Sequence, residues 1–154
     1  MCHAFEPTEE RYDKLCQTAQ LNSGYIIPVK KGLSDNCGEI EIITDISSPS
    51  FILTKGGEKT EIIEVMTLDK YVEETKLQRI DFIKSDIEGA ERNLLMGARK
   101  VMKEFAPKLS ICTYHLPDDP EILAEIIMDA NPKYKIIQLK SKLMAMVMEK
   151  LKCL

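Results

Sequence analysis

The fold of this chain is decided by the stretch Lys84-Ser85-Asp86-Ile87-Glu88-Gly89-Ala90-Glu91, which places three carboxylates and a glycine between two apolar segments. Residues 80–83 before it are mainly apolar. The apolar residues after it recur at the spacing of one helix face: Leu94, Leu95, Ala98, Val101, Met102 and Phe105. The pattern predicts a buried strand at 80–84 that turns into a helix at 88–105. Open α/β sheets bind their ligands at such a point, beyond the carboxyl ends of the strands.

Three acids crowded at a strand end need a partner: a cation, the hydroxyls of a ligand, a substrate proton or the amides of the helix itself. A purely structural interpretation is also available. Asp86 can cap the helix, Glu88 can lie in its first turn, and Gly89 can allow close packing. The spacing alone does not choose between a site and a capped helix.

The rest of the chain alternates strands and helices, which predicts a single α/β domain over residues 1–154 with a mostly parallel sheet. Two apolar runs near the end, separated by Lys140-Ser141-Lys142, predict a closing antiparallel hairpin from Tyr134 to Met148. Met144, Met146 and Met148 alternate along it and are interpreted as core filling. The expected helices are 8–21, 67–72, 88–105 and 120–130; the expected strands are 2–5, 25–29, 39–44, 61–65, 80–84, 109–114, 134–139 and 143–148; and the expected loops are 32–36 and 47–59, the latter long and mobile.

Composition excludes several classes of protein. The chain has 154 residues, a formal net charge of −4 and no cluster of Lys and Arg, so nucleic acid is not an expected partner. It contains no apolar span of membrane length and no signal peptide, which predicts a cytoplasmic protein without a membrane segment. Five scattered cysteines with no Cys-x-x-Cys pair argue against a disulfide framework. Cys112 and His115 would point to opposite faces of a strand, so no metal site is expected.

Five short motifs occur in the order and spacing of the FkbM-type methyltransferases, and the chain resembles that family over almost its whole length. They are Ala4-Phe5-Glu6-Pro7, Leu33-Ser34-Asp35, Thr67-Leu68-Asp69, Lys84-x-Asp86-x-Glu88-Gly89-Ala90-Glu91 and Pro107-Lys108-Leu109…Tyr114-His115. The resemblance implies a Rossmann-like fold and S-adenosylmethionine as the cofactor. It also implies O-methylation of a small-molecule or glycan acceptor, such as the hydroxyl of a sugar, a glycan or a polyketide.

The chain departs from the family pattern at its start. Family members begin with a strand and a glycine-rich loop that surrounds the methionine part of the cofactor, whereas none of the seven glycines here forms a Gly-x-Gly cluster. The first strand of the family would lie between the strands at 2–5 and 80–84. We expect a truncated product, direct pairing of these two strands, or a strand supplied by another chain. A truncated sheet predicts low stability or self-association, because unpaired buried backbone groups cost about 1–3 kcal/mol each. It also predicts weak binding of S-adenosylmethionine by this chain alone.

The resemblance assigns cofactor contacts to residues that follow strands. Glu6 resembles the acid that binds both ribose hydroxyls of the cofactor; its alternative role is to start the next helix. Asp35 is placed where an acid could accept from the adenine amino group; its alternative role is that of a turn residue.

Asp86 resembles the acid on the acceptor side of the cofactor site, and it is a candidate both for cofactor binding and for catalysis. Methyl transfer requires alignment and removal of the acceptor's proton, and Asp86 or His115 are the candidate bases. The alternative for His115 is a surface or hydrogen-bonded histidine. Glu88 and Glu91 are expected to serve as orienting groups in the site or as capping groups for the helix.

Three functions compete at this point. The first is a methyltransferase that is active with the N-terminal segment restored. The second is a non-catalytic fragment or interaction module that keeps the fold without the cofactor, and the third is another Rossmann-like binder, for instance of a nucleotide. Glu6 and Asp86 fit the first and third, and the absent glycine loop favours the second.

Overall fold

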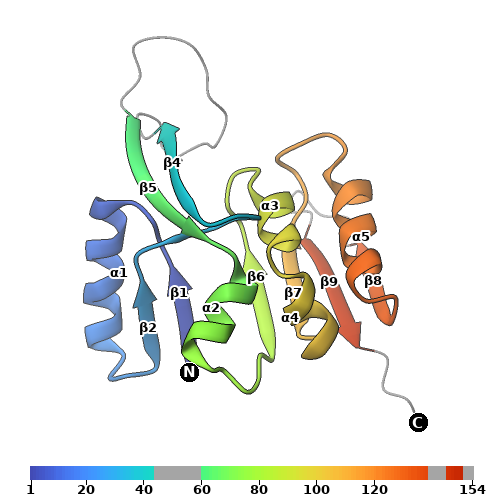
Figure 1. Cartoon of the computed structure of the whole chain (residues 1–154), viewed down its shortest axis with the longest axis horizontal. Coiled ribbons are helices and arrows are strands. Elements are labelled where there is room, and N and C mark those ends of the chain that lie inside the picture. Colours follow the sequence, from blue (N-terminus) through green and yellow to red (C-terminus); the bar gives the residue numbers. More distant parts are fainter. Residues whose placement is uncertain (44–59, 139–144, 151–154) are drawn as a thin grey trace.

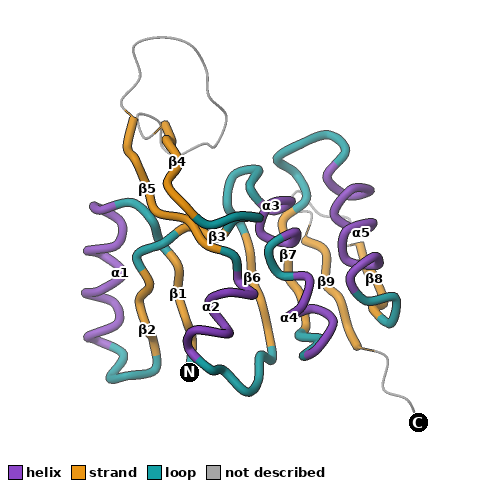
Figure 2. Tube along the Cα trace, viewed as in Figure 1, coloured by secondary structure: helices purple, strands orange, loops and turns teal. Residues whose placement is uncertain are grey.

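The computed structural model describes residues 1–43, 60–138 and 145–150, and its helices and strands alternate as the sequence predicts (Figures 1 and 2). In chain order the elements are β1 (Cys2–Phe5), α1 (Glu9–Leu21), β2 (Ile26–Val29), β3 (Gly32–Leu33), β4 (Gly38–Ile43), β5 (Thr60–Met66), α2 (Leu68–Thr75), β6 (Phe82–Ser85), α3 (Glu91–Met96), α4 (Arg99–Glu104), β7 (Lys108–Cys112), α5 (Asp119–Ala130), β8 (Tyr134–Gln138) and β9 (Ala145–Lys150).

The strands form three hydrogen-bonded groups. β1 pairs with β2 in parallel, β5 pairs in parallel with β3 and antiparallel with β4, and the last group has the order β6-β7-β9-β8. Within this last group β6 and β7 are parallel, while β9 runs antiparallel to both of its neighbours. The α/β architecture with a terminal antiparallel pair is therefore confirmed.

β1 and β6 belong to different groups, and no ladder joins them in the described part of the chain. Of the three alternatives given for the missing strand, direct pairing of these two strands is therefore wrong. Within the described ranges, β1 is hydrogen-bonded on one edge, to β2, and β6 on one edge, to β7. Self-association through these edges stays a prediction.

The main core lies between helices α3, α4 and α5 and the sheet that contains β7 and β8 (Figure 1). Its members are apolar residues that the sequence periodicity places on inward faces, and six of them are 0% exposed: Leu95, Met102, Leu109, Ile111, Leu123 and Ile127. This core fixes the ends of β6 and β7, which carry the central acid stretch and the Tyr114-His115 pair.

The prediction of one continuous helix at 88–105 is wrong. The segment forms two helices, α3 and α4, which are separated at Gly97 and Ala98. A Cβ atom at Gly97 would lie 2.0 Å from the carbonyl oxygen of Ser34, so the chain approaches the loop after β3 there more closely than any side chain allows. Asp69 then accepts from the backbone N–H groups of Lys100 and Val101, at 3.0 and 2.9 Å, and begins α4 as a cap supplied by a distant segment.

On α1, the less exposed face is formed by Tyr12, Leu15, Cys16 and Ala19, which are half-buried, and the helix contains no buried residue. Two other expectations need correction. The expected loop at 32–36 contains the short strand β3, and the expected strand at 109–114 ends earlier, at Cys112. The expected loop at 47–59 and the side chains of Met144, Met146 and Met148 lie outside the described residues. None of the described helices has the length and apolar character needed to cross a membrane.

Candidate functional site

The loop that follows β6 is held by a buried glutamate. Glu91, the first residue of α3, is 0% exposed and accepts the backbone N–H groups of Ile87 and Gly89, at 2.7 and 3.0 Å. Glu88 and Gly89 adopt φ angles of +56° and +97°, so the chain reverses here before the helix begins. The alternative in which Asp86 caps this helix is wrong, because Asp86 is hydrogen-bonded to Tyr114 and Glu91 binds the loop amides. Glu91 orients the loop, which is one of the two roles expected for it, and the N-cap residue Ala90 makes no side-chain cap.

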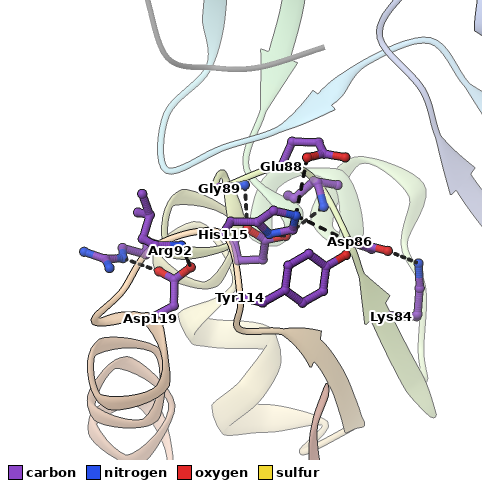
Figure 3. A network of polar contacts seen from close by, with 11 residues as sticks. Lys84, Asp86, Glu88, Gly89, Arg92, Tyr114, His115 and Asp119 are labelled. Atoms are coloured by element: carbon purple, nitrogen blue, oxygen red, sulfur yellow. Dashed lines mark hydrogen bonds and ion pairs between the residues drawn. The ribbon is translucent and has the colours of Figure 1, made fainter. Parts of the chain in front are cut away.

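Asp86 points away from the helix toward the residues that follow β7 (Figure 3). The Tyr114 hydroxyl donates to Asp86 Oδ1 at 2.8 Å, and Lys84 Nζ lies 3.8 Å from Oδ2. Partial burial works against ionisation of Asp86, but Tyr114, the Cys112 thiol, Lys84 and His115 outweigh it and lower its pKa. The same hydrogen bond raises the pKa of Tyr114 above its ordinary value. Asp86 is therefore an ionised carboxylate at neutral pH.

His115 lies in the loop after β7 and not on the expected strand, and its side chain is only 9% exposed. Its Nε2 is 3.7 Å from Asp86 Oδ1 and 3.5 Å from Glu88 Oε2, and its Nδ1 is 3.3 Å from Glu91 Oε1 (Figure 3). The Tyr114 ring packs against the imidazole with centroids 4.3 Å apart. The structure thus brings the two candidate bases, Asp86 and His115, together, with Glu88 and Glu91 on either side.

A charged clamp fastens the two loops to each other. Arg92 Nε donates to Asp119 Oδ1 at 2.7 Å, and its Nη2 donates to Asp118 Oδ1 at 2.6 Å. Asp119 is 0% exposed, and its Oδ2 also accepts the backbone N–H of Leu116 at 2.9 Å. Because Leu116 follows His115 directly, the clamp fixes the loop that carries the histidine. Sequence reasoning missed it, because the two partners are 27 residues apart and Asp119 has the position of an ordinary helix start.

Glu6 follows β1, and Asp35 follows β3. Glu6 Oε1 accepts from the backbone N–H and the hydroxyl of Thr8, at 2.9 and 2.6 Å, so Glu6 takes part in the start of α1. Asp35 is exposed in a bend and accepts from the Ser34 hydroxyl at 3.1 Å. Both alternative roles from the sequence are therefore present in the structure, and within the described ranges no hydrogen bond or ion pair joins either acid to Asp86.

The arrangement of the strands places Glu6 and Asp86 at one edge of the molecule. β1 and β6 run in the same direction in Figure 1, and each acid comes directly after the last residue of its strand. Carboxylates there can accept from ligand hydroxyls or from a reacting proton. The site therefore has acceptor groups suited to a polyhydroxylated ligand and an ionised acid beside a histidine.

Comparison with known proteins gives consistent results. Residues 1–135 match the model of the methyltransferase FkbM domain. The hexuronic acid methyltransferase AglP of Haloferax volcanii is 27% identical over 141 residues, which are 88% of this chain and 56% of that protein. A crystal structure of a methyltransferase FkbM from Methylobacillus flagellatus superposes with a TM-score of 0.73 at 22% identity, over 96% of this chain and 36% of that chain, and so shares its fold. The chain spans about half the length of the curated relative. It spans 36% of the chain in the crystal structure.

Proposed function

Because the chain belongs to the FkbM methyltransferase domain family, we propose that it transfers a methyl group from S-adenosylmethionine to a hydroxyl of a sugar, a glycan or a polyketide-like acceptor. The observation that carries the proposal is the Asp86–Tyr114–His115 cluster at the ends of β6 and β7. The name of the relative, a hexuronic acid methyltransferase, favours a sugar among these acceptors.

We assign the cofactor side of the site to Glu6, Asp35 and Asp86. When bound, S-adenosylmethionine supplies a methyl group on a sulfonium centre. The Glu6 carboxylate fits the vicinal hydroxyls of a ribose, because a carboxylate accepts from two donors at once and Thr8 uses only its Oε1 among the described contacts. The exposed Asp35 carboxylate fits an amino group such as that of adenine.

On the acceptor side, the chain has to align a hydroxyl and remove its proton. The new bond joins the acceptor oxygen to the methyl carbon while the bond from sulfur to that carbon breaks, and the hydroxyl proton passes to Asp86 or His115. The hydrogen bond from Tyr114 keeps Asp86 ionised and fixes its orientation. Glu91 holds the loop, and the Arg92–Asp119 pair fixes the opposite loop, so both candidate bases face the same space.

The proposal is tested by methyl transfer with the full-length protein, isotope-labelled S-adenosylmethionine and hexuronate-containing oligosaccharides, with the methylated product detected by mass spectrometry. Asp86→Asn should lower kcat by about 10²–10⁴-fold, the usual contribution of a general base. Asp81→Asn, at an exposed acid ahead of the same strand, should leave kcat unchanged. A full-length protein that neither binds the cofactor nor transfers a methyl group would instead support the non-catalytic module.

A further inference from the structure

The imidazole of His115 is buried and makes no hydrogen bond to the described residues. Its side chain is more than nine-tenths buried, and neither Nδ1 nor Nε2 has a hydrogen-bonding partner among the described residues. Both nitrogens nevertheless face carboxylate oxygens, at 3.3 Å for Glu91 and at 3.5 and 3.7 Å for Glu88 and Asp86. Burying a polar group without a partner costs about 1–3 kcal/mol, so the arrangement calls for a ligand.

The side chains around His115 carry more negative than positive charge, which also favours a cationic ligand. Three carboxylates, those of Asp86, Glu88 and Glu91, face a single imidazole (Figure 3). Among the described residues, the cationic side chain paired with these carboxylates is Lys84, whose Nζ lies 3.8 Å from Asp86 Oδ2. Even with Lys84 counted, the cluster keeps an excess of negative charge. A buried or half-buried excess of this kind is stabilised by a bound cation.

The geometry points to a divalent cation, of the Mn²⁺ or Mg²⁺ class, bound by Asp86, Glu91 and one nitrogen of His115. One ligand atom from each of these three residues lies within 4.8 Å of the other two. Around an ion with bonds of about 2.1 Å, ligands at right angles are about 3 Å apart and opposite ligands about 4.2 Å apart, so small side-chain shifts close the site. A set dominated by oxygen with one imidazole suits Mn²⁺.

The hydrogen bonds of Glu91 are compatible with this role. Its two oxygens accept from the amides of Ile87 and Gly89, but each carboxylate oxygen has two lone pairs, so an oxygen can bind an amide and an ion together. The amides also fix the direction of the carboxylate, as outer contacts do for metal ligands in general. Glu88, although it lies 3.5 Å from His115, is more exposed and is not part of the three-residue set.

The inference deepens the proposed function and rests on it in one respect. A cation at this position would bind an oxygen of the acceptor and lower the pKa of that hydroxyl, which suits an acceptor with neighbouring oxygen ligands, such as a uronic acid. His115 would then be a ligand and not a base. Binding of the ion itself depends only on the residues described above.

Paramagnetic broadening in the NMR spectrum tests the site in the untagged wild-type protein. The chain has two histidines, His3 and His115, and His3 is the internal control, because it lies at the start of β1 and is bonded to Tyr71 instead. Substoichiometric Mn²⁺ should broaden the ring signals of His115 well before those of His3. Equal broadening of both histidines, or no broadening of His115 at millimolar Mn²⁺, would overturn the proposal.

Titration calorimetry with Mn²⁺ alone measures the affinity of the wild type and of matched variants. Asp86→Asn and His115→Phe should each weaken binding by about tenfold or more, while Glu88→Gln, which removes the same charge from the same loop, should change it by less than about threefold. If His115→Phe does not fold, Asp86→Asn is compared with Glu88→Gln. Asp86 is partly exposed, so its substitution should leave the fold intact. Wild-type affinity in Asp86→Asn would contradict the site. A protein that binds Mn²⁺ but transfers no methyl group would keep the site and reject the proposed function.

Discussion

Helix α1 and strands β1 and β2 contain no buried residue, whereas β7 and α5 contain several that are completely buried. Two β1 side chains contact Tyr71 of α2 and help to join the N-terminal elements to the rest. His3 Nδ1 lies 2.6 Å from the Tyr71 hydroxyl, and the Phe5 ring meets the same tyrosine edge-on. The C-terminal elements instead surround a continuous apolar core. The residue proposed for the ribose, Glu6, thus lies on the loosely packed part, and the proposed acceptor site lies on the tightly packed part.

The largest difference in the free energy of unfolding should appear when one isoleucine in each region is replaced by alanine. Ile111→Ala, at a position that is 0% exposed, should lower the free energy of unfolding by about 3–5 kcal/mol because it leaves a cavity. Ile27→Ala, at a half-buried position on β2, should cost about 1 kcal/mol. Urea unfolding of both variants measures the difference. Equal losses would show that the N-terminal strands are as well packed as the core.

The charged clamp sharpens the comparison within the C-terminal part. Asp119→Asn should cost about 2–3 kcal/mol, because an amide has one acceptor oxygen where Asp119 serves both Arg92 and the Leu116 amide. Asp118→Asn is the matched control, since it contacts the same arginine from an exposed position, and it should cost less than about 1 kcal/mol. Similar losses for both in urea unfolding would mean that burial does not set the strength of this network.

The cap on α4 should have a smaller effect. Asp69→Ala removes the acceptor of two backbone amides and should lower the free energy of unfolding by about 1 kcal/mol. Hydrogen exchange should become faster at Lys100 and Val101 and stay unchanged in α5. Asp81→Ala, at an exposed acid, is the control. Exchange rates at these two amides that match the wild type would show that Asp69 does not start the helix.

The smallest effect concerns His3 in the N-terminal part. Burial, followed by the charge of the N-terminus, lowers the pKa of His3 below its ordinary value of 6.5, so the folded state favours the neutral ring. The unfolded chain therefore takes up the proton first as the pH falls. The contribution of neutral His3 to the free energy of unfolding is complete above pH 6.5. It is lost as the pH falls from 6.5 toward the lower pKa of the folded state. The melting temperature of His3→Gln should depend less on pH than that of the wild type in this window; identical profiles would exclude a role for His3.

The elements were predictable where a local pattern determines them. The alternation of apolar and polar residues predicts β4 and β5, and the caps and proline around residues 119–131 predict α5. The break between α3 and α4 was not predictable, because Gly97 and Ala98 fit a helix and the obstacle is the distant carbonyl of Ser34.

The site was predictable in part for the same reason. Asp86 follows an apolar run that predicts a strand, and this local signal identifies it. The expected burial of that strand is wrong, because Phe82 in β6 is 56% exposed. The burial of His115 against Glu91, and the clamp from Arg92 to Asp119, join residues that are 24 and 27 positions apart. Contacts of this kind depend on how two loops pack, and no local pattern encodes them.

The central claim is a division of the site between a cofactor acid on the loosely packed part and a catalytic acid on the tightly packed part. Steady-state kinetics of the full-length protein test it most directly, with S-adenosylmethionine varied at saturating acceptor. Glu6→Gln should raise the KM for S-adenosylmethionine by about 10–100-fold and change kcat by less than about threefold, because it removes charged hydrogen bonds to a bound cofactor. Asp86→Asn should show its main effect on kcat. An unchanged KM in Glu6→Gln, or an unchanged kcat in Asp86→Asn, would contradict the account.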